Sequence, residues 1–231
     1  MRDLQKAIGY QFKDQSLLEQ ALTHTSYANE VCKDGLRSYE RLEFLGDSIL
    51  GFTTADYLLG AFPRLHEGDL TKLRADLVCE ASLAQTASKL GLGDYLRLGR
   101  GEEAGGGRRR TSIIADVVEA IIAAIYLDGG LTAAKRFIYT HVLVDTQARI
   151  QLNTYYKTML QELVQQKKNQ VLAYELTGET GPDHDKQFSV RVLLNGEAVG
   201  TGTGTSKKRA EQAAAKQAIA CLFPDVAKEN A

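Results

Sequence analysis

The chain has 231 residues, of which 44% are hydrophobic and 25% charged, and its formal net charge is −1. This composition predicts a globular protein of one large or two small domains, and the balanced charge excludes a global field that would attract a polyanion. The three cysteines lie far apart and in no CxxC or CxH spacing, which argues against a disulfide framework or a zinc site: Cys32, Cys79 and Cys221.

The first part of the chain shows helical spacing of apolar residues nearly throughout, and it contains no signal core or apolar run long enough to cross a bilayer. Pro63 and the pair Gly129-Gly130 are predicted to end helices, and residues 99–110 to form a Gly-rich basic loop. We therefore expect an all-α domain over residues 1–149 in a cytoplasmic protein without a membrane partner. The predicted helical stretches are 17–28, 39–50, 69–92, 112–130 and 131–148.

The second part of the chain changes character and predicts a small α+β domain of order α-β-β-β-α. We expect a helix from Lys157 to about Lys167, a strand at 171–177, a hairpin over 187–205, and a last helix from Lys207. The dipeptide Asn195-Gly196 is typical of a type I′ hairpin turn. The predicted boundaries are 150–156 for a linker, 157–223 for the domain and 224–231 for a tail.

The stretch "YERLEFLGDSIL", residues 39–50, places Glu40, Glu43 and Asp47 at i, i+3 and i+7. On a helix these positions fall within roughly one-sixth of the circumference and form one acidic face. No Lys or Arg shares that face to offset the repulsion. The pattern fits either a solvated face that tolerates mild repulsion or part of a metal site.

A second acidic pair stands in "IIADVVEAIIAAIYL", residues 113–127, where Asp116 and Glu119 are the two charged residues of a helix that is apolar on every side. Such a helix is buried, and ionised carboxylates inside it need a partner, either a buried Arg or a cation. If the two acidic stretches pack together, their oxygens suit Mg²⁺ or Mn²⁺ and phosphoryl chemistry. A di-iron site is excluded because no histidine follows a Glu by three, and His24 is predicted to bond a helix end or the core.

Several blocks of the sequence resemble those of one known family. "ERLEFLGDS" (Glu40 to Ser48) looks like the signature of the ribonuclease III endonucleases, and "ADVVEAIIAAIYLDGG" and "EGDLTKLRADLV" resemble two further blocks of that family. The α-β-β-β-α unit resembles a double-stranded-RNA-binding domain, so the resemblance spans nearly the whole chain. One position departs from the pattern, because the family signature is often preceded by Asn and here Tyr39 stands there.

The resemblance implies Mg²⁺-dependent hydrolysis of double-stranded RNA, with Mn²⁺ as a substitute. It also implies staggered cuts that leave 5′ phosphates and 3′ overhangs, and the processing of ribosomal-RNA precursors and structured transcripts. Asp47 and Glu119 are the expected catalytic residues, while Glu40 and Glu67 match acidic positions expected to hold water or support the ligands. The metal would be held by Glu43, Asp47, Asp116 and Glu119.

Phe44 lies more than 120° from the leucine stripe of its predicted helix, so it is not part of that helix's core face. It packs either against another element of the same domain or, as the resemblance implies, in the partner subunit of a two-fold homodimer. A two-fold dimer would offer one active site to each antiparallel strand of a duplex.

The predicted last helix opens with Ser206 as N-cap and three basic residues in its first turn, where positive charge opposes the helix dipole. This favours a phosphate site over a solvated charge run. "GTGTGTSKK" fits no nucleotide-binding loop, so no nucleotide cofactor is expected. Arg108-Arg109-Arg110 could contact phosphate or could be an exposed loop without a role. The predicted RNA-binding residues, partly from the resemblance, are Gln161, Glu162, His184, Ser206, Lys207, Lys208 and Arg209.

Two other functions compete with a double-stranded-RNA endonuclease. An RNA-binding scaffold on a silenced nuclease fold would be expected to lack some of the acidic residues, all of which are present. A hydrolase of small phosphate esters would leave the C-terminal basic turn unexplained. We therefore expect the nuclease.

Overall fold

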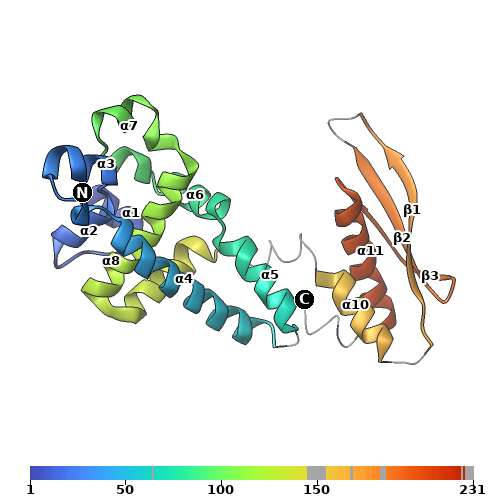
Figure 1. Ribbon diagram of the computed structural model, residues 1–231. Coiled ribbons are helices and arrows are strands. Elements are labelled where there is room, and N and C mark those ends of the chain that lie inside the picture. The colour runs from blue at the N-terminus through green and yellow to red at the C-terminus, as the bar shows by residue number, and fades with distance from the viewer. Residues whose placement is uncertain (64, 145–154, 167–168, 183–185, 225, 227–231) are drawn as a thin grey trace. The chain divides into compact units, whose positions relative to one another are not determined.

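The structure is a computed structural model that describes residues 1–63, 65–144, 155–166, 169–182, 186–224 and 226. It divides into two compact units, Met1–Val144 and Asp145–Ala231, each of which is considered by itself (Figure 1). The predicted linker, residues 150–156, and the predicted tail, residues 224–231, fall largely outside the described ranges, so their boundaries stay predictions.

The first unit is all-α, as predicted, and its apolar core surrounds the long helix α8. Short 3₁₀ turns occur at Gly35–Arg37, Leu92–Tyr95 and Gly107–Arg109, and π-helical turns at Ala28–Cys32 and Ile138–Val142. The helices are α1 (Arg2–Ile8), α2 (Gln15–Ala21), α3 (Thr25–Tyr27), α4 (Glu40–Ala61), α5 (Glu67–Val78), α6 (Glu80–Lys89), α7 (Arg100–Ala104) and α8 (Thr111–Phe137).

Helix α8 confirms the prediction of a buried helix over most of the acidic segment, because the apolar residues from Ile113 to Ile125 are buried and pack against α2, α4 and α6, whereas Leu127 is 51% exposed. The backbone leaves the helical conformation at Gly130 (φ 79°, ψ 177°), so the predicted stop is a kink that joins two helical segments. Neither α8 nor any other helix in the described ranges is long and apolar enough to cross a membrane.

Three predicted elements of the first unit are wrong in detail. The helix expected at 17–28 breaks where His24 N donates to Arg97 O (3.0 Å), which ties the chain to a distant segment. The helix expected at 69–92 is interrupted at Cys79, whose backbone is extended (φ −67°, ψ 156°). The expected loop at 99–110 contains the short helix α7 and a 3₁₀ turn. Local spacing of apolar residues does not reveal these breaks, because long-range contacts and single extended residues cause them.

The second unit has the predicted α-β-β-β-α order, with an antiparallel sheet of strand order β1-β2-β3. Asn195 (φ 54°) and Gly196 (φ 87°) both adopt the positive φ angles of the predicted type I′ turn. Figure 1 shows both helices on one side of the sheet. The elements are α10 (Tyr155–Gln165), β1 (Leu172–Thr180), β2 (Gln187–Leu194), β3 (Glu197–Gly204) and α11 (Lys207–Leu222).

Strand β3 alternates Gly and Thr, and the three glycines face α11. A Cβ at Gly202 would overlap the backbone of Ala214, and one at Gly204 would lie 2.7 Å from Ala210 N. Ala210 and Ala214 are fully buried in this contact. The "GTGTG" sequence is therefore a packing surface that lets a helix lie directly on a strand.

Candidate functional site

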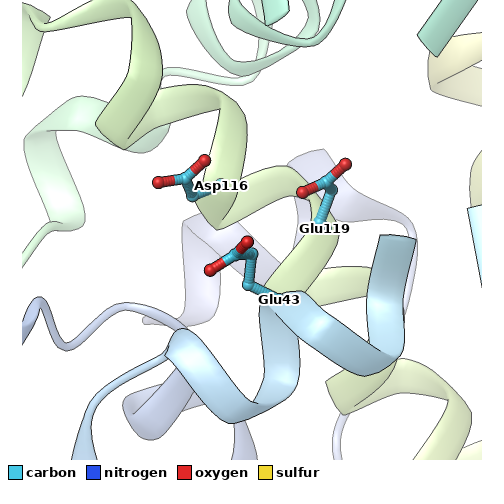
Figure 2. Close-up of side chains that lie close together, drawn as sticks. All are labelled: Glu43, Asp116 and Glu119. Atoms are coloured by element: carbon cyan, nitrogen blue, oxygen red, sulfur yellow. The ribbon is translucent and has the colours of Figure 1, made fainter. Parts of the chain in front are cut away.

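Three carboxylates from the two acidic stretches meet where α4 crosses α8. One oxygen each of Glu43, Asp116 and Glu119 lies within 4.8 Å of the others, and all three side chains are half-buried. Figure 2 shows Glu43 rising from α4 toward the turn of α8 that carries Asp116 and Glu119. We call these residues the acidic triad. Oxygen ligands at this spacing are what Mg²⁺ or Mn²⁺ prefers.

Gly46 allows the two helices to come close enough for this meeting. It is buried on α4, and a Cβ at this position would overlap the carbonyl oxygen of Glu119. The sequence analysis did not identify Gly46, although a signal was present. A glycine inside a helix is destabilising by about 1 kcal/mol relative to alanine, so it indicates a reason of packing.

The charges of the triad are not balanced by protein cations. Within the described ranges no Lys or Arg lies within ion-pair distance of the triad, so the alternative of a buried Arg is wrong there. Burial, and then the charges of Asp47, Glu43 and Asp116, raise the pKa of Glu119 to about 8. Burial, and then the charge of Asp116, also raise the pKa of Glu43. The site therefore favours either a proton or a cation.

Tyr39 is a second residue that the sequence analysis did not place in the site. Its side chain is 3% exposed, and its hydroxyl donates to Asp116 Oδ2 at 3.4 Å. Burial and then the negative charge of Asp116 raise the pKa of Tyr39 well above its usual range. In the sequence, only the position of Tyr39 indicates this role. A tyrosine at a helix N-cap does not cap the helix, so its side chain is available for another contact.

The other predicted acidic residues lie outside the triad. Asp47 is exposed one turn after Glu43, and its charge is the largest electrostatic contribution to the raised pKa of Glu119. Glu40 is exposed, and its charge raises the pKa of Glu43. Glu67 is exposed on α5, where its carboxylate accepts from Thr71 Oγ1 at 2.9 Å. Asp47 and Glu40 thus influence the triad, and the structure does not bring Glu67 to it.

His24 is a helix-end residue, as predicted. Its Nδ1 accepts from Ser26 N at 3.1 Å and so caps α3. The His24 ring also lies edge-on to Tyr39, with ring centroids 5.7 Å apart. His24 therefore packs against Tyr39, which contacts Asp116, without joining the triad.

Phe44 is 77% exposed, so the alternative that it packs within its own unit is wrong. Phe52 (57% exposed) and Leu59 (67% exposed) follow it along α4. At 100° per residue all three fall within an arc of about 80°. They form a strip of exposed apolar side chains on one side of the helix.

In the second unit, Ser206 is the predicted N-cap of α11, and its Oγ accepts from Arg209 N at 3.2 Å. Lys207 Nζ bonds Glu179 Oε1 at 3.2 Å, and Arg209 Nη1 donates to Thr205 Oγ1 at 2.9 Å. Lys208 is exposed and forms no ion pair with another described residue. The basic turn is thus present, and Lys208 is its least restrained member.

The remaining predicted RNA contacts lie on α10 and in a loop. Gln161 is exposed on α10, and Glu162 is half-buried and has an interaction partner. His184 lies outside the described residues. The prediction for these three residues stays a prediction.

The basic stretch before α8 is not simply an exposed loop without a role, because two of its three arginines have partners within the fold. Arg108 Nη1 donates to Gly93 O (3.0 Å) and Leu96 O (2.9 Å), and its Nε donates to Glu103 Oε1 (2.6 Å). Arg110 pairs with Glu102, whereas Arg109 is exposed and forms no ion pair with another described residue. Two of these three arginines therefore stabilise the fold.

Comparison with known proteins agrees with both units. A family model described as ribonuclease-III-like matches residues 14–146, and one described as a double-stranded RNA binding motif matches residues 156–222. A Ribonuclease 3 from Listeria monocytogenes serotype 4a is 45% identical over 218 residues, which cover 94% of this chain and 95% of that protein. A Ribonuclease 3 from Caldanaerobacter subterraneus is 48% identical over 221 residues, which cover 95% of this chain and 96% of that protein.

Among solved structures, the nuclease domain of ribonuclease III from Campylobacter jejuni superposes with a TM-score of 0.57 at 42% identity. It covers 61% of this chain and 94% of that domain. That structure is described as showing flexibility in a region involved in dimer formation. A second structure of the same domain has the same TM-score at 41% identity, and covers 62% of this chain and 93% of that domain.

Proposed function

The chain belongs to the ribonuclease III family and is an endoribonuclease of double-stranded RNA, and we propose that the acidic triad and Asp47 hold the divalent metal of its reaction. The observation that carries this proposal is the meeting of three carboxylates within 4.8 Å with no Lys or Arg paired to them in the described ranges. We propose Mg²⁺ as the natural ion and Mn²⁺ as a substitute, because both take oxygen ligands and share the site with substrate phosphate.

The residues present fit such an ion. Half-buried carboxylates that raise one another's pKa are destabilising by themselves, and a divalent cation removes this cost. A bound ion would activate water for in-line attack on phosphorus and stabilise charge on the attacking and leaving oxygens. We propose that Asp47, which is exposed and whose charge raises the pKa of Glu119, completes the ligand set or orients the water.

Glu119 has a further role in this proposal. Without a cation its carboxyl holds a proton up to a pH of about 8, so metal binding must release that proton. Glu119 and Asp47 are the proposed catalytic residues, and Glu40 supports them through its charge on Glu43. Glu67 does not reach the acidic triad of its own chain. If Glu67 supports a metal site, that site is therefore not the triad of the same chain.

We propose that the second unit holds the RNA through the first turn of α11. The backbone N–H groups of Lys207 and Lys208 have no acceptor among the described residues, and they point out of the helix end that carries positive partial charge. Gln161 and Glu162 on α10 would lie in the minor groove, with His184 as a further contact. Recognition of this kind reads the shape of the duplex and its 2′-hydroxyls, so sequence preference is weak.

We also propose that the enzyme is a homodimer, with the apolar strip of α4 at the subunit interface. The strip exposes Phe44, Phe52 and Leu59, and a side chain as apolar as Phe44 gains from burial in a partner. The description of the Campylobacter jejuni domain refers to dimer formation in that protein. A two-fold dimer would cut both strands of a duplex and leave staggered ends with 5′ phosphates and 3′ overhangs.

The proposed substrates are ribosomal-RNA precursors and structured transcripts, cut in the cytoplasm where they are made. A shape-based reading of duplexes supports this choice, because such RNAs contain long paired stems.

The test is cleavage of a long, end-labelled RNA duplex in Mg²⁺ or EDTA, with RNA binding measured in parallel by gel shift. Wild type is expected to cut the duplex in Mg²⁺ and not in EDTA. Loss of a partner that merely orients a metal ligand typically lowers activity 10- to 100-fold, so we expect Glu119→Gln to lower it by about 100-fold or more. Glu119→Gln should still bind the duplex.

The matched control is Glu19→Gln, which removes a surface carboxylate that pairs with Arg97 at 3.5 Å, away from the triad. It should cut like wild type. If wild type binds the duplex and never cuts under any divalent metal, the acidic residues are structural and the chain is an RNA-binding scaffold in a nuclease fold.

A further inference from the structure

We propose that Tyr39 is a positioning residue of the metal site, whose buried hydroxyl holds the Asp116 carboxylate in the orientation that faces Glu43 and Glu119. The hydroxyl lies 3.4 Å from Asp116 Oδ2. In the ranges that the structure describes, this is the one side-chain hydrogen bond made to the triad. The inference rests on the proposed function, because it concerns the same metal site.

Tyr39 is itself fixed by several contacts. Its backbone N donates to Thr23 O at 2.8 Å, and its ring lies against the ring of His24. The side chain is almost fully buried, so it has little freedom to rotate. A hydroxyl held in this way can restrain the carboxylate that it contacts, whereas a surface tyrosine could not.

The same residue links the two helices of the site. The carbonyl oxygen of Tyr39 accepts from the backbone N of Glu43 at 2.8 Å, at the start of α4, while the hydroxyl reaches Asp116 on α8. Tyr39 thus connects the N-terminal end of α4 to Asp116, a proposed metal ligand on α8. It therefore contacts one residue of the triad on each helix, Glu43 through its backbone and Asp116 through its hydroxyl.

A tyrosine suits this task better than a cation. A Lys or Arg would neutralise Asp116 and compete with a metal ion, but a phenol is neutral and leaves the negative charge in place. The phenolic O–H can donate a hydrogen bond without carrying a charge. The bond is made to Oδ2, which leaves Oδ1 for other ligation.

The test compares Tyr39→Phe with wild type by titrating the metal-free, full-length protein with Mn²⁺ and following the free ion by electron paramagnetic resonance. Partners that orient metal ligands typically contribute 10- to 100-fold in affinity, and this bond is long, so we expect the Mn²⁺ Kd to rise about three- to tenfold. The Mg²⁺ concentration for half-maximal cleavage should rise by a similar factor, while saturating Mg²⁺ restores most of the turnover. Duplex binding should not change.

The matched control is Tyr10→Phe. Tyr10 also donates to a carboxylate, Asp128 Oδ2 at 2.7 Å, but that carboxylate lies outside the triad. We expect Tyr10→Phe to lower the melting temperature and leave the Mn²⁺ Kd unchanged. The pair therefore separates loss of stability from loss of ligand orientation.

The outcomes are distinguishable. If Tyr39→Phe binds Mn²⁺ as wild type does, whatever its melting temperature, Tyr39 is a packing residue and the inference is overturned while the metal site stands. If folded wild type binds no Mn²⁺, the proposed metal site fails and this inference fails with it. A rise in Kd for Tyr39→Phe alone supports both.

Discussion

Both units of the molecule use glycine to bring two backbones into contact, but for different ends. In the first unit Gly46 lets α4 approach Glu119 on α8, and the closeness crowds carboxylates that repel one another. In the second unit Gly200, Gly202 and Gly204 let α11 lie on β3, and the contact is made mainly by buried alanines, with Arg209 at the Gly204 end. The carboxylates crowded at the first contact reduce stability and create a site, whereas the second contact increases stability and supports one.

The close contact has a different purpose in each unit. The β3–α11 contact holds the helix whose first turn carries Lys207 and Lys208, so its product is the position of a basic surface. The α4–α8 contact makes the reactive site directly. Substitutions that reopen each contact should therefore have different consequences for metal, RNA and stability.

Gly46→Ala should have the largest effect. The added Cβ would overlap a backbone carbonyl that cannot move aside alone, so the helices must separate, and we expect a loss of about 3 kcal/mol or more. Cleavage should fall below detection because the triad separates. Gly51→Ala on the same helix is the control, since a Cβ there meets nothing within 4 Å, and it should stabilise by about 0.5–1 kcal/mol. Thermal unfolding and duplex cleavage measure both variants, and equal behaviour of the two would contradict the close-approach argument.

Gly202→Ala should break the other contact alone. Its Cβ would overlap the backbone of Ala214, so we expect the second unit to unfold at a much lower temperature while the transition of the first unit stays in place. Duplex binding should be lost, but Mn²⁺ binding should remain. Gly178→Ala is the control, because the nearest atom to its Cβ would be Ser189 Cβ at 4.0 Å. Calorimetry of the full chain resolves the transitions, and loss of Mn²⁺ binding would show that the units are not independent.

Glu119→Gln should test the claim that the crowded carboxylates of the first contact reduce stability. The pKa of Glu119 is raised from 4.5 to about 8, so the unfolded chain loses this proton at lower pH than the folded one. Wild type is therefore destabilised relative to the variant as pH rises from about 4.5 to about 8. Allowing for solvent screening at this half-exposed group, we expect the variant to be more stable in EDTA by about 1–2 kcal/mol above pH 8.

The measurement is the melting temperature of both proteins against pH in EDTA and in Mg²⁺. The difference should vanish below about pH 4.5 and grow toward pH 8 in EDTA, and Mg²⁺ should stabilise wild type more than the variant. A difference that does not vary with pH would show that Glu119 is not under electrostatic stress.

Local chemistry made much of this structure predictable. The pair Asp116 and Glu119 could be identified from the sequence, because a charged side chain in a helix that is apolar on every side needs a partner. Ser206 and the turn at Asn195-Gly196 were found because each needs a particular residue type at one position. Such features depend on a few neighbouring residues, which the sequence shows directly.

Other features depend on contacts between distant segments and could not be read from spacing. From the sequence, Arg108 is predicted to be a basic residue of a loop. In the structure it donates to the carbonyls of Gly93 and Leu96 and to Glu103. Tyr39 reads as a flanking aromatic, yet it reaches a carboxylate 77 positions away in the sequence. Asp47 shares the acidic face of Glu43 on a helical wheel, but the carboxylates that meet are those of Glu43, Asp116 and Glu119. A helical wheel predicts which residues share a face of a helix, but tertiary packing determines which of their atoms come into contact.

The basic turns of the two units give the smallest and most specific test of the comparison. Lys208 is exposed and unpaired within the described ranges, so Lys208→Ala should weaken duplex binding about three- to fivefold at physiological salt and reduce the salt slope by about one. Arg108→Ala should instead lower the melting temperature of the first unit, because it loses bonds to Gly93 O and Glu103, and leave the salt slope unchanged. Gel shifts at several salt concentrations decide between them. If Arg108 sets the slope and Lys208 does not, the RNA is held by the unit that cuts it, and the second unit's glycine-packed helix serves another purpose.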